Sequence, residues 1–376
     1  MQKKTFKYIL ILLCISMLSC MQNNTANASK GTETTTDTVT SEPAKKSMPA
    51  EITMAFTGDI MMGTNFPDAS YVTRDRGKSL FNDCKEVMSA ADITIINLEG
   101  TCYDGTDGEL REMTSPSSYY IFRMPGDHAQ NLADAGVDVV NFANNHSFDF
   151  GMTGRKNTIQ TMRNAGVEVS GIRELAEGCI LERKGIKIGY VSFAASCTKV
   201  NDMLNKEEVE RLVKKYRKES DLLIVGFHGG AEGVTYMHVP MKEEFYVGED
   251  RGNVHDFAHT CIDLGADIVV GHGPHVPRAM ELYKGHLIAY SLGNFCAPYR
   301  MSLKGACGHA PLLCVSINPE DGTFNNGKIH SYLQQTGAGP HTDAGNTAAK
   351  DIRQMTLADF PNTGISIAED GTVTKK

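Results

Sequence analysis

The chain has 376 residues, of which 37 are basic and 45 acidic, and its net charge is −8 at neutral pH. No basic cluster appears along it, which argues against nucleic acid as a partner. The part beyond the first 50 residues is long enough for one large α/β domain. Ten cysteines occur without any Cys-x-x-Cys pair, so a thiolate zinc site is not expected.

The first 19 residues have the pattern of a bacterial export signal. Basic residues precede an apolar run at 8–13 that is too short to span a bilayer, and small residues lead to Cys20. The segment 17–20 resembles a lipoprotein signal, in which Cys20 becomes the lipidated first residue. The alternative is an ordinary secretory signal with a chance cysteine. Either interpretation predicts that the protein is exported.

Residues 20–50 are rich in Thr, Asn, Ser, Lys and Glu, and we expect them to form a lipidated, disordered tether. The chain is therefore divided into a signal peptide at 1–19, this tether at 20–50, and a folded domain at 51–376, of which 340–376 is the C-terminal segment. We expect a membrane-anchored lipoprotein of the bacterial cell envelope. No later stretch is long and apolar enough to cross a bilayer.

Hydrophobic patterning predicts a mixture of strands and helices from residue 51 onward. Strands are expected at 51–55, 92–96, 137–143, 167–170, 179–183, 186–193, 221–227, 266–270, 278–283, 286–295, 311–317, 328–334 and 364–368. Helices are expected at 80–91, 129–135, 154–165, 205–220, 255–264 and 348–357. The stretch 101–124, rich in Ser, Gly, Asp and Tyr, is expected to be a long loop that serves as a substrate lid.

Polar side chains that can bind metal follow several of these strands. Asp59 lies between glycines after the first strand, where its carboxylate either faces a cleft or caps the next helix. Asn97 and Glu99 lie two residues apart and therefore on one side if the second strand continues. Glu99 can then bridge metal ions with Asn97 in support; the alternative is a polar strand end that faces solvent.

The next strand, at 137–143, leads into a denser group of polar residues. It is followed by Asn144, Asn145 and His146, with Asp149 three residues later. This group offers a carbonyl ligand, an imidazole and a carboxylate that can orient the imidazole. A metal-ligating or acid-acting histidine usually has such a partner.

Three later turns complete the candidate set. His228 ends a buried strand, and Glu232 follows it in a glycine-rich turn, which favours a ligand over a structural histidine. His272 and His275 are held close together by glycines directly after another buried strand. Such a strand end is a rigid place to mount a ligand, although paired loop histidines can also be surface residues. Asn294 occupies the polar turn after the strand at 286–295.

One further pair of histidines is left out of the predicted site. His255 and His259 lie one turn apart on one face of the helix expected at 255–264. This spacing can bind metal, but the sequence shows no third ligand for it. A pair of this kind is typical of an exposed helix surface.

The combined ligand types indicate the metal and the chemistry. Carboxylate, amide and imidazole suit divalent ions such as Mn, Fe or Zn rather than copper. The candidates are too many for one tetrahedral ion, whereas two ions about 3.5–4 Å apart, bridged by a carboxylate, accommodate them. Such a pair activates water, which indicates hydrolysis of a phosphoester or an amide. The ordered set is Asp59, Glu99, Asn145, His146, His228, His272 and His275.

Six motifs in order make the chain from Glu51 to about Asp370 resemble the CapA proteins of poly-γ-glutamate capsule synthesis, a branch of the calcineurin-like metallophosphoesterase superfamily. The motifs are Phe56–Met61, Asn97–Glu99, Ala143–Gly151, His228–Glu232, Gly271–His275 and Tyr290–Phe295. Met61 and Glu99 stand where the wider superfamily has a histidine and a bridging aspartate, and Gly229 stands where many relatives have tryptophan.

The resemblance implies a four-layer α/β/β/α sandwich of the metallo-dependent phosphatase type, with the metal site at the strand ends. It casts His146 as the acid near the leaving group, with Asp149 as its catalytic partner. The metal-site residues that it implies are Asp59, Glu99, Asn145, His228, His272 and His275. The residues expected around ligands or substrate are Asn97, Asn144, Glu232 and Asn294.

The function expected from this resemblance is the handling of an anionic surface polymer such as poly-γ-glutamate, in its synthesis, export or attachment. As an enzyme the protein would be a hydrolase with one or two divalent ions. Two alternatives stay open: a non-catalytic component that binds or assembles polymer in the same cleft, and an envelope phosphoesterase. The expected partners are the polymer or a phosphoester, the membrane through the lipid anchor, and other capsule or envelope proteins.

Overall fold

The computed structural model describes residues 48–105, 107–111 and 120–376. The predicted signal peptide, Cys20 and the tether up to residue 47 lie outside the described residues, and so do residues 106 and 112–119 of the predicted lid. Within the described ranges, no helix combines the length and the apolar character needed to cross a membrane.

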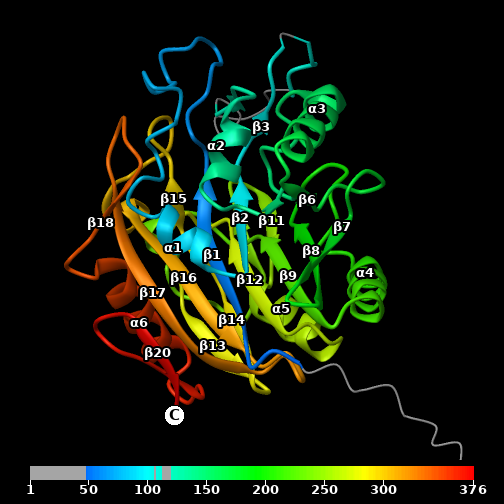
Figure 1. Cartoon of the computed structure of the whole chain (residues 1–376), viewed down its shortest axis with the longest axis vertical. Helices are drawn as coiled ribbons and strands as arrows, with labels where there is room; N and C mark the ends of the chain where they lie inside the picture. Colours follow the sequence, from blue (N-terminus) through cyan, green and yellow to red (C-terminus); the bar gives the residue numbers. More distant parts are fainter. Residues whose placement is uncertain (1–47, 106, 112–119) are drawn as a thin grey trace, which may run out of the picture. The chain divides into compact units, whose positions relative to one another are not determined.

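The larger of two main sheets has ten strands, with the order β19-β20-β17-β16-β1-β2-β5-β6 and with β15 and β18 paired to β1 and β17 (Figure 1). Strands β1, β2, β5, β6 and β15 are parallel where they pair, and β16 runs antiparallel to β1. The carboxyl ends of the parallel strands therefore meet at one edge. The strand bounds are β1 (Ile52–Ile60), β2 (Ile93–Leu98), β5 (Val139–Asn141), β6 (Glu168–Ser170), β15 (Asn294–Cys296), β16 (His309–Ile317), β17 (Phe324–Gln334), β18 (Pro340–Thr342), β19 (Ile365–Ile367) and β20 (Thr372–Lys375).

The second main sheet has six strands in the order β13-β14-β12-β9-β8-β7. Its central strands β8, β9, β12 and β14 are parallel, whereas β7 and β13 run antiparallel at the two edges. The bounds are β7 (Gly178–Arg183), β8 (Ile186–Ala194), β9 (Leu222–His228), β12 (Ile268–His272), β13 (Met280–Tyr283) and β14 (His286–Ala289).

Helices cover the outer face of each sheet. Buried side chains of α1, α2 and α3 pack in one core with the larger sheet, and those of α4 and α5 pack in another with the smaller sheet. Helix α6 has buried residues in two cores, one between the sheets and one on the side of α4 and α5. The bounds are α1 (Lys85–Ala90), α2 (His128–Asp134), α3 (Gly151–Asn164), α4 (Lys206–Glu219), α5 (Val254–Asp263) and α6 (Thr347–Asp359).

A third core lies between the two sheets and makes the architecture a four-layer sandwich. Alternate residues of β1 divide between the two faces, as expected for a strand: Met54 and Phe56 pack with Ile224 and Ile268 of the second sheet, whereas Ala55 packs on the side of α1–α3. The α/β/β/α architecture expected from the resemblance is therefore confirmed.

Several element boundaries differ from the prediction. Strand β1 continues to Ile60, so Asp59 lies inside the strand and does not cap a helix. Helix α1 begins only at Lys85, because residues 74–84 form a series of turns. The hairpin of β10 (Glu244–Tyr246) and β11 (Glu249–Gly252) escaped prediction, since its charged sequence lacks an apolar alternation.

Short elements complete the described chain. They are β3 (Thr101–Cys102), β4 (Arg123–Met124), and the 3₁₀ helices η2 (Val234–Tyr236) and η3 (Gly305–Gly308). Strands β3 and β4 pair within the stretch expected to be a loop. The eight cysteines of the described part are all free.

Candidate metal centre

Four strands from both sheets bring their terminal polar residues together. Asp59 lies in β1, Glu99 follows β2, and His228 and His272 end β9 and β12, where they are register neighbours. All four are buried, with at most 2% of the residue exposed. One ligand atom each of Asp59, Glu99 and His228 lies within 4.8 Å of the other two. The convergence expected from the sequence therefore occurs.

An amide framework holds the two carboxylates in place. The Asn97 side chain donates to Oδ1 of Asp59 at 2.8 Å and to Oε2 of Glu99 at 2.6 Å. Asn144 in turn donates to Oδ1 of Asn97 at 3.2 Å and to the Leu98 carbonyl at 2.8 Å. Because Asn97 donates its amide hydrogens to both acids, it fixes their separation. Asn144 in turn orients the Asn97 amide through its own hydrogen bonds.

Several buried ligand-type atoms of the cluster have no hydrogen-bond partner among the described residues. They are Glu99 Oε1, Asn145 Oδ1, His272 Nδ1 and both ring nitrogens of His228. An unpaired buried polar atom costs roughly 1–3 kcal/mol, so a group of them at one place indicates that something else satisfies them. Carboxylate oxygen, amide oxygen and imidazole nitrogen are ligands for Mn, Fe and Zn. The residues present fit a centre for divalent ions.

His275 joins the cluster from the turn after β12. Its Nδ1 lies 2.8 Å from Oδ2 of Asp59 and 2.9 Å from Oδ1 of Asn294. The Asn294 amide donates to the carbonyl of Cys307 at 3.2 Å, which directs its oxygen toward the histidine. These contacts require β1 to lie very close to the turn before β15. Only glycine allows this approach at position 58, because a Cβ there would lie 2.1 Å from the carbonyl oxygen of Gly293.

The two buried carboxylates have opposite electrostatic environments. Burial, together with the nearby charge of Asp59, raises the pKa of Glu99 from 4.5 to about 8. Burial acts on Asp59 in the same sense, but the two imidazoles beside its carboxylate outweigh it and hold the pKa of Asp59 well below its usual range: His275 by hydrogen bonding to Oδ2 at 2.8 Å, and His272 with its Nδ1 3.4 Å from Oδ1. The two carboxylates therefore differ in acidity, with that of Asp59 increased and that of Glu99 decreased.

The pKa values of His228 and His275 are also shifted in opposite directions. Burial lowers the pKa of His228 well below its usual value of 6.5, so its ring is neutral and can bind metal through either nitrogen. Burial also opposes the charge of His275, but its hydrogen bond to Asp59 and the charge of Glu232 raise its pKa to about 10. A cation that replaced the His275 proton would meet the same acidic surroundings.

His146 and Asp149 form a pair beside the ligand cluster. Nδ1 of His146 lies 2.9 Å from Oδ2 of Asp149, which also accepts the backbone N–H of Phe122 at 2.7 Å. Nε2 of His146 lies 4.0 Å from Oε1 of Glu99. A carboxylate oxygen only accepts hydrogen bonds, so His146 must carry a proton on Nδ1 to donate to Asp149. Nε2 on the other side of the ring is then directed toward the cluster. This is the orientation expected from the sequence.

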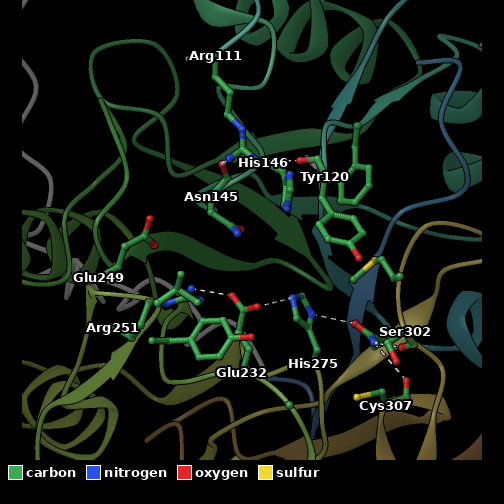
Figure 2. Close-up of a pocket in the computed structure, with 16 residues that line it drawn as sticks. Arg111, Tyr120, Asn145, His146, Glu232, Glu249, Arg251, His275, Ser302 and Cys307 are labelled. Carbon is green, nitrogen blue, oxygen red and sulfur yellow. Dashed lines mark hydrogen bonds and ion pairs between the residues drawn. The ribbon is translucent and has the colours of Figure 1, made fainter. Parts of the chain in front are cut away.

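A cavity of about 570 Å³ opens onto these residues (Figure 2). Its walls include five of the predicted site residues, namely Asn145, His146, Glu232, His275 and Asn294. Asp59, Glu99, His228 and His272 are buried and do not line it, so the predicted residues divide into a buried ligand group and a cavity-lining group.

Two arginines at the cavity were not among the residues predicted from the sequence. Arg251 of β11 is 3% exposed and donates to Oε1 of Glu232 at 2.7 Å, while Oε2 of Glu232 lies 3.8 Å from Nε2 of His275. Arg111 lies 3.1 Å from Oδ1 of Asp149 and donates to the carbonyl of Asn145 at 3.2 Å. Neither arginine follows an apolar strand, so no strand-end pattern could identify it.

Comparisons with known proteins identify relatives of this chain. The sequence model of a family described as "Bacterial capsule synthesis protein PGA_cap" matches residues 53–299, which include every predicted metal-site residue. The chain is 28% identical over 269 residues to the PGA biosynthesis protein CapA of Bacillus subtilis, covering 65% of this chain and 63% of that protein. It is 25% identical over 270 residues to the capsule biosynthesis protein CapA of Bacillus anthracis, covering 67% and 61%.

The chain thus spans about three fifths of the length of the two CapA proteins it matches. Among solved structures, a phosphatase of Mycoplasma pneumoniae aligns with a TM-score of 0.48 and 16% sequence identity, covering 77% of this chain and 96% of the phosphatase.

Proposed function

This chain belongs to the PGA_cap family of bacterial capsule synthesis proteins, and on that premise we propose that it is a metal-dependent hydrolase acting on an anionic surface polymer of the poly-γ-glutamate kind. It acts in the synthesis, export or attachment of that polymer at the cell envelope. The observation that carries the proposal is the set of unpaired, buried ligand atoms beside the His146–Asp149 pair, at one cavity.

The proposed centre would hold divalent ions, Mn, Fe or Zn, through the buried strand-end residues together with Asn145 and His275 from the cavity wall. Ions bound there supply positive charge that polarises the scissile group and lowers the pKa of water. Glu99 would hold an ion through Oε1, which has no partner among the described residues, while Asn97 orients the carboxylate by donating to Oε2. The proposed ligands are Asp59, Glu99, Asn145, His228, His272 and His275.

His146 is the proposed general acid. Asp149 accepts a hydrogen bond from the Nδ1–H group and stabilises the charged form of the ring. The proton on Nε2 is therefore the one that can pass to a leaving amine or alkoxide. Phe122 packs on the ring with a centroid separation of 4.4 Å and restricts its rotation. The residue that donates the proton is therefore held by two contacts before substrate arrives.

The cavity wall carries two arginines beside two acidic residues, Glu232 and Glu249. Arg251 and Arg111 line it, on a protein whose overall charge is −8. Nε and Nη2 of Arg251 are buried and have no hydrogen-bond partner among the described residues, so an oxyanion that reached them would satisfy both. We assign recognition of substrate carboxylates to this wall of the cavity.

The proposal includes export and a lipid anchor at Cys20, which rest on the basic, apolar and small-residue pattern of residues 1–20. Fractionation of bacteria that express the protein tests this part. The wild-type chain is expected in the membrane fraction, and the Cys20→Ser variant is expected to lose lipid labelling. Unchanged labelling in that variant would exclude Cys20 as the attachment site.

The catalytic part is tested by incubating Mn-loaded protein with poly-γ-glutamate, γ-glutamyl peptides and phosphoesters, and following chain length, free amine and phosphate. Shortened polymer that is not formed by His146→Gln supports the proposal. The matched control is His341→Gln, an exposed histidine beside Asp83. Release of phosphate alone would make the protein an envelope phosphoesterase, and binding without cleavage would make it an assembly component.

A further inference from the structure

A second cluster of metal-ligating side chains lies outside the centre described above. His255 and His259 stand one turn apart on α5, and Glu281 comes from β13, the edge strand of the six-stranded sheet. None of the three lines the cavity beside His146. No sequence pattern joins Glu281 to the histidines, because it lies 22 residues beyond His259.

The three side chains have the spacing of a metal site. Nε2 of His259 lies 2.9 Å from Oε2 of Glu281, and the rings of His255 and His259 have centroids 4.1 Å apart. One ligand atom of each residue lies within 4.8 Å of the other two. All three residues are partly buried, so an ion can reach them from solvent.

Neighbouring groups hold the candidate ligands in place. The buried Tyr290 hydroxyl donates to Oε2 of Glu281 at 2.7 Å, which orients the carboxylate as outer partners do in metal sites. The His259 ring stacks on Tyr283 with centroids 3.7 Å apart, and the His255 ring lies nearly parallel to Phe360. Restricted side chains lose less entropy when they bind an ion.

The alternative is that this cluster is only a histidine–carboxylate pair within an aromatic stack. The chain contains such pairs, for example His341 with Asp83. In the described part, however, only two groups of three histidine, cysteine or acidic side chains have the spacing of a metal site. One is the strand-end group and the other is this cluster, so a second imidazole distinguishes it from an ordinary pair.

We propose that His255, His259 and Glu281 form a second divalent-metal site, separate from the centre beside the cavity, that takes zinc. Two imidazoles and one carboxylate are a common zinc ligand set, and three protein ligands leave a position for water. Zinc at this site connects α5 to β13 and therefore stabilises the edge of the second sheet. The site requires no hydrolytic activity, so it stands independently of the proposed function.

The test is a zinc count on the full chain. Protein is stripped with a chelator, saturated with zinc chloride, desalted, and analysed for bound zinc. Wild-type protein is expected to bind one zinc more than His259→Gln or Glu281→Gln. The variant His228→Gln, changed in the strand-end centre, is expected to keep that additional ion. Equal zinc content in wild type, His259→Gln and Glu281→Gln would overturn the proposal.

His341→Gln is the matched control, because it removes an exposed histidine that has a carboxylate partner but no second imidazole. Loss of the same zinc equivalent in this control would show adsorption to surface histidines and would also overturn the proposal. A second measurement uses thermal unfolding in the His228→Gln background. Zinc is expected to raise Tm there, and the further change His259→Gln is expected to abolish the rise.

Discussion

Replacement of Glu99 by glutamine is expected to change how the stability of the metal-free protein depends on pH. Glu99 is fully buried, and its pKa is raised from 4.5 to about 8 in the folded protein. Between these two values the folded state keeps a proton that the unfolded state has lost, so the free energy of unfolding falls as pH rises. The Gln variant has no such proton and therefore lacks this contribution.

The size of the effect follows from the same shift. A group that is protonated only in the folded state changes stability by about 1.4 kcal/mol per pH unit. His275, whose raised pKa also gives stability that is lost with rising pH, contributes mainly above 6.5. The window from pH 5.0 to 6.5 therefore isolates Glu99. There the wild type should lose about 2 kcal/mol relative to Glu99→Gln.

The assay is urea unfolding of both proteins at pH 5.0 and 6.5 in the presence of a chelator. Taking the difference between the two proteins cancels the titration of all other carboxylates. A difference that stays constant across the window would refute the inference that Glu99 is protonated in the metal-free site. Addition of Mn at pH 6.5 should abolish the loss of unfolding free energy that the wild type shows relative to Glu99→Gln. Bound Mn replaces the Glu99 proton, so the wild type no longer depends on that proton for stability.

Three further predictions concern binding and catalysis. Metal binding at pH 7 should release about two protons, one from Glu99 and one from His275, because the pKa values of both groups are raised. Calorimetry in buffers of different ionisation enthalpy measures this release, and release of no proton would contradict the raised pKa values. His146→Gln should lower kcat on the order of 10²–10⁴-fold, and Asp149→Asn should lower kcat less. Both variants should keep the metal content of the wild type, and loss of metal in either would exclude a purely catalytic role for that residue. Arg251→Lys should raise KM for an anionic substrate more than it lowers kcat, because lysine cannot replace a planar, multidentate guanidinium; an effect on kcat alone would argue against substrate recognition.

The strand-end residues could be predicted from the sequence because each follows an apolar run and lies close to glycines. Asp59, Glu99, His228 and His272 all have this pattern. Parallel strands place such residues at one edge of a sheet, so their gathering within each sheet could be expected from the sequence. The meeting of the two sheets' edges could not be predicted, because Asp59 and Glu99 come from the larger sheet and His228 and His272 from the second. The order in which the strands pair could not be predicted from the sequence either. His228 and His272 are neighbours because β9 and β12 are adjacent, which is a property of the topology.

Other contacts could not be predicted, because they depend on segments without periodic patterns. Arg251 reaches Glu232 from a charged hairpin, and Asn294 faces His275 because the chain leaves the second sheet after β14 and β15 pairs with β1 of the larger sheet. Glu281 has the pattern of an ordinary strand residue, and only the fold places it beside α5. Sequence pattern identifies residues that end strands, whereas contacts between distant, irregular segments require the packed structure.

Elemental analysis of protein purified with Mn supplied tests the central claim most directly, alongside His228→Ala and the control His341→Ala. The account predicts one or two ions per wild-type chain, the same content in the control, and a clear loss in His228→Ala. Wild-type protein without bound metal under these conditions, or equal metal content in all three proteins, would contradict a metal centre at the strand ends.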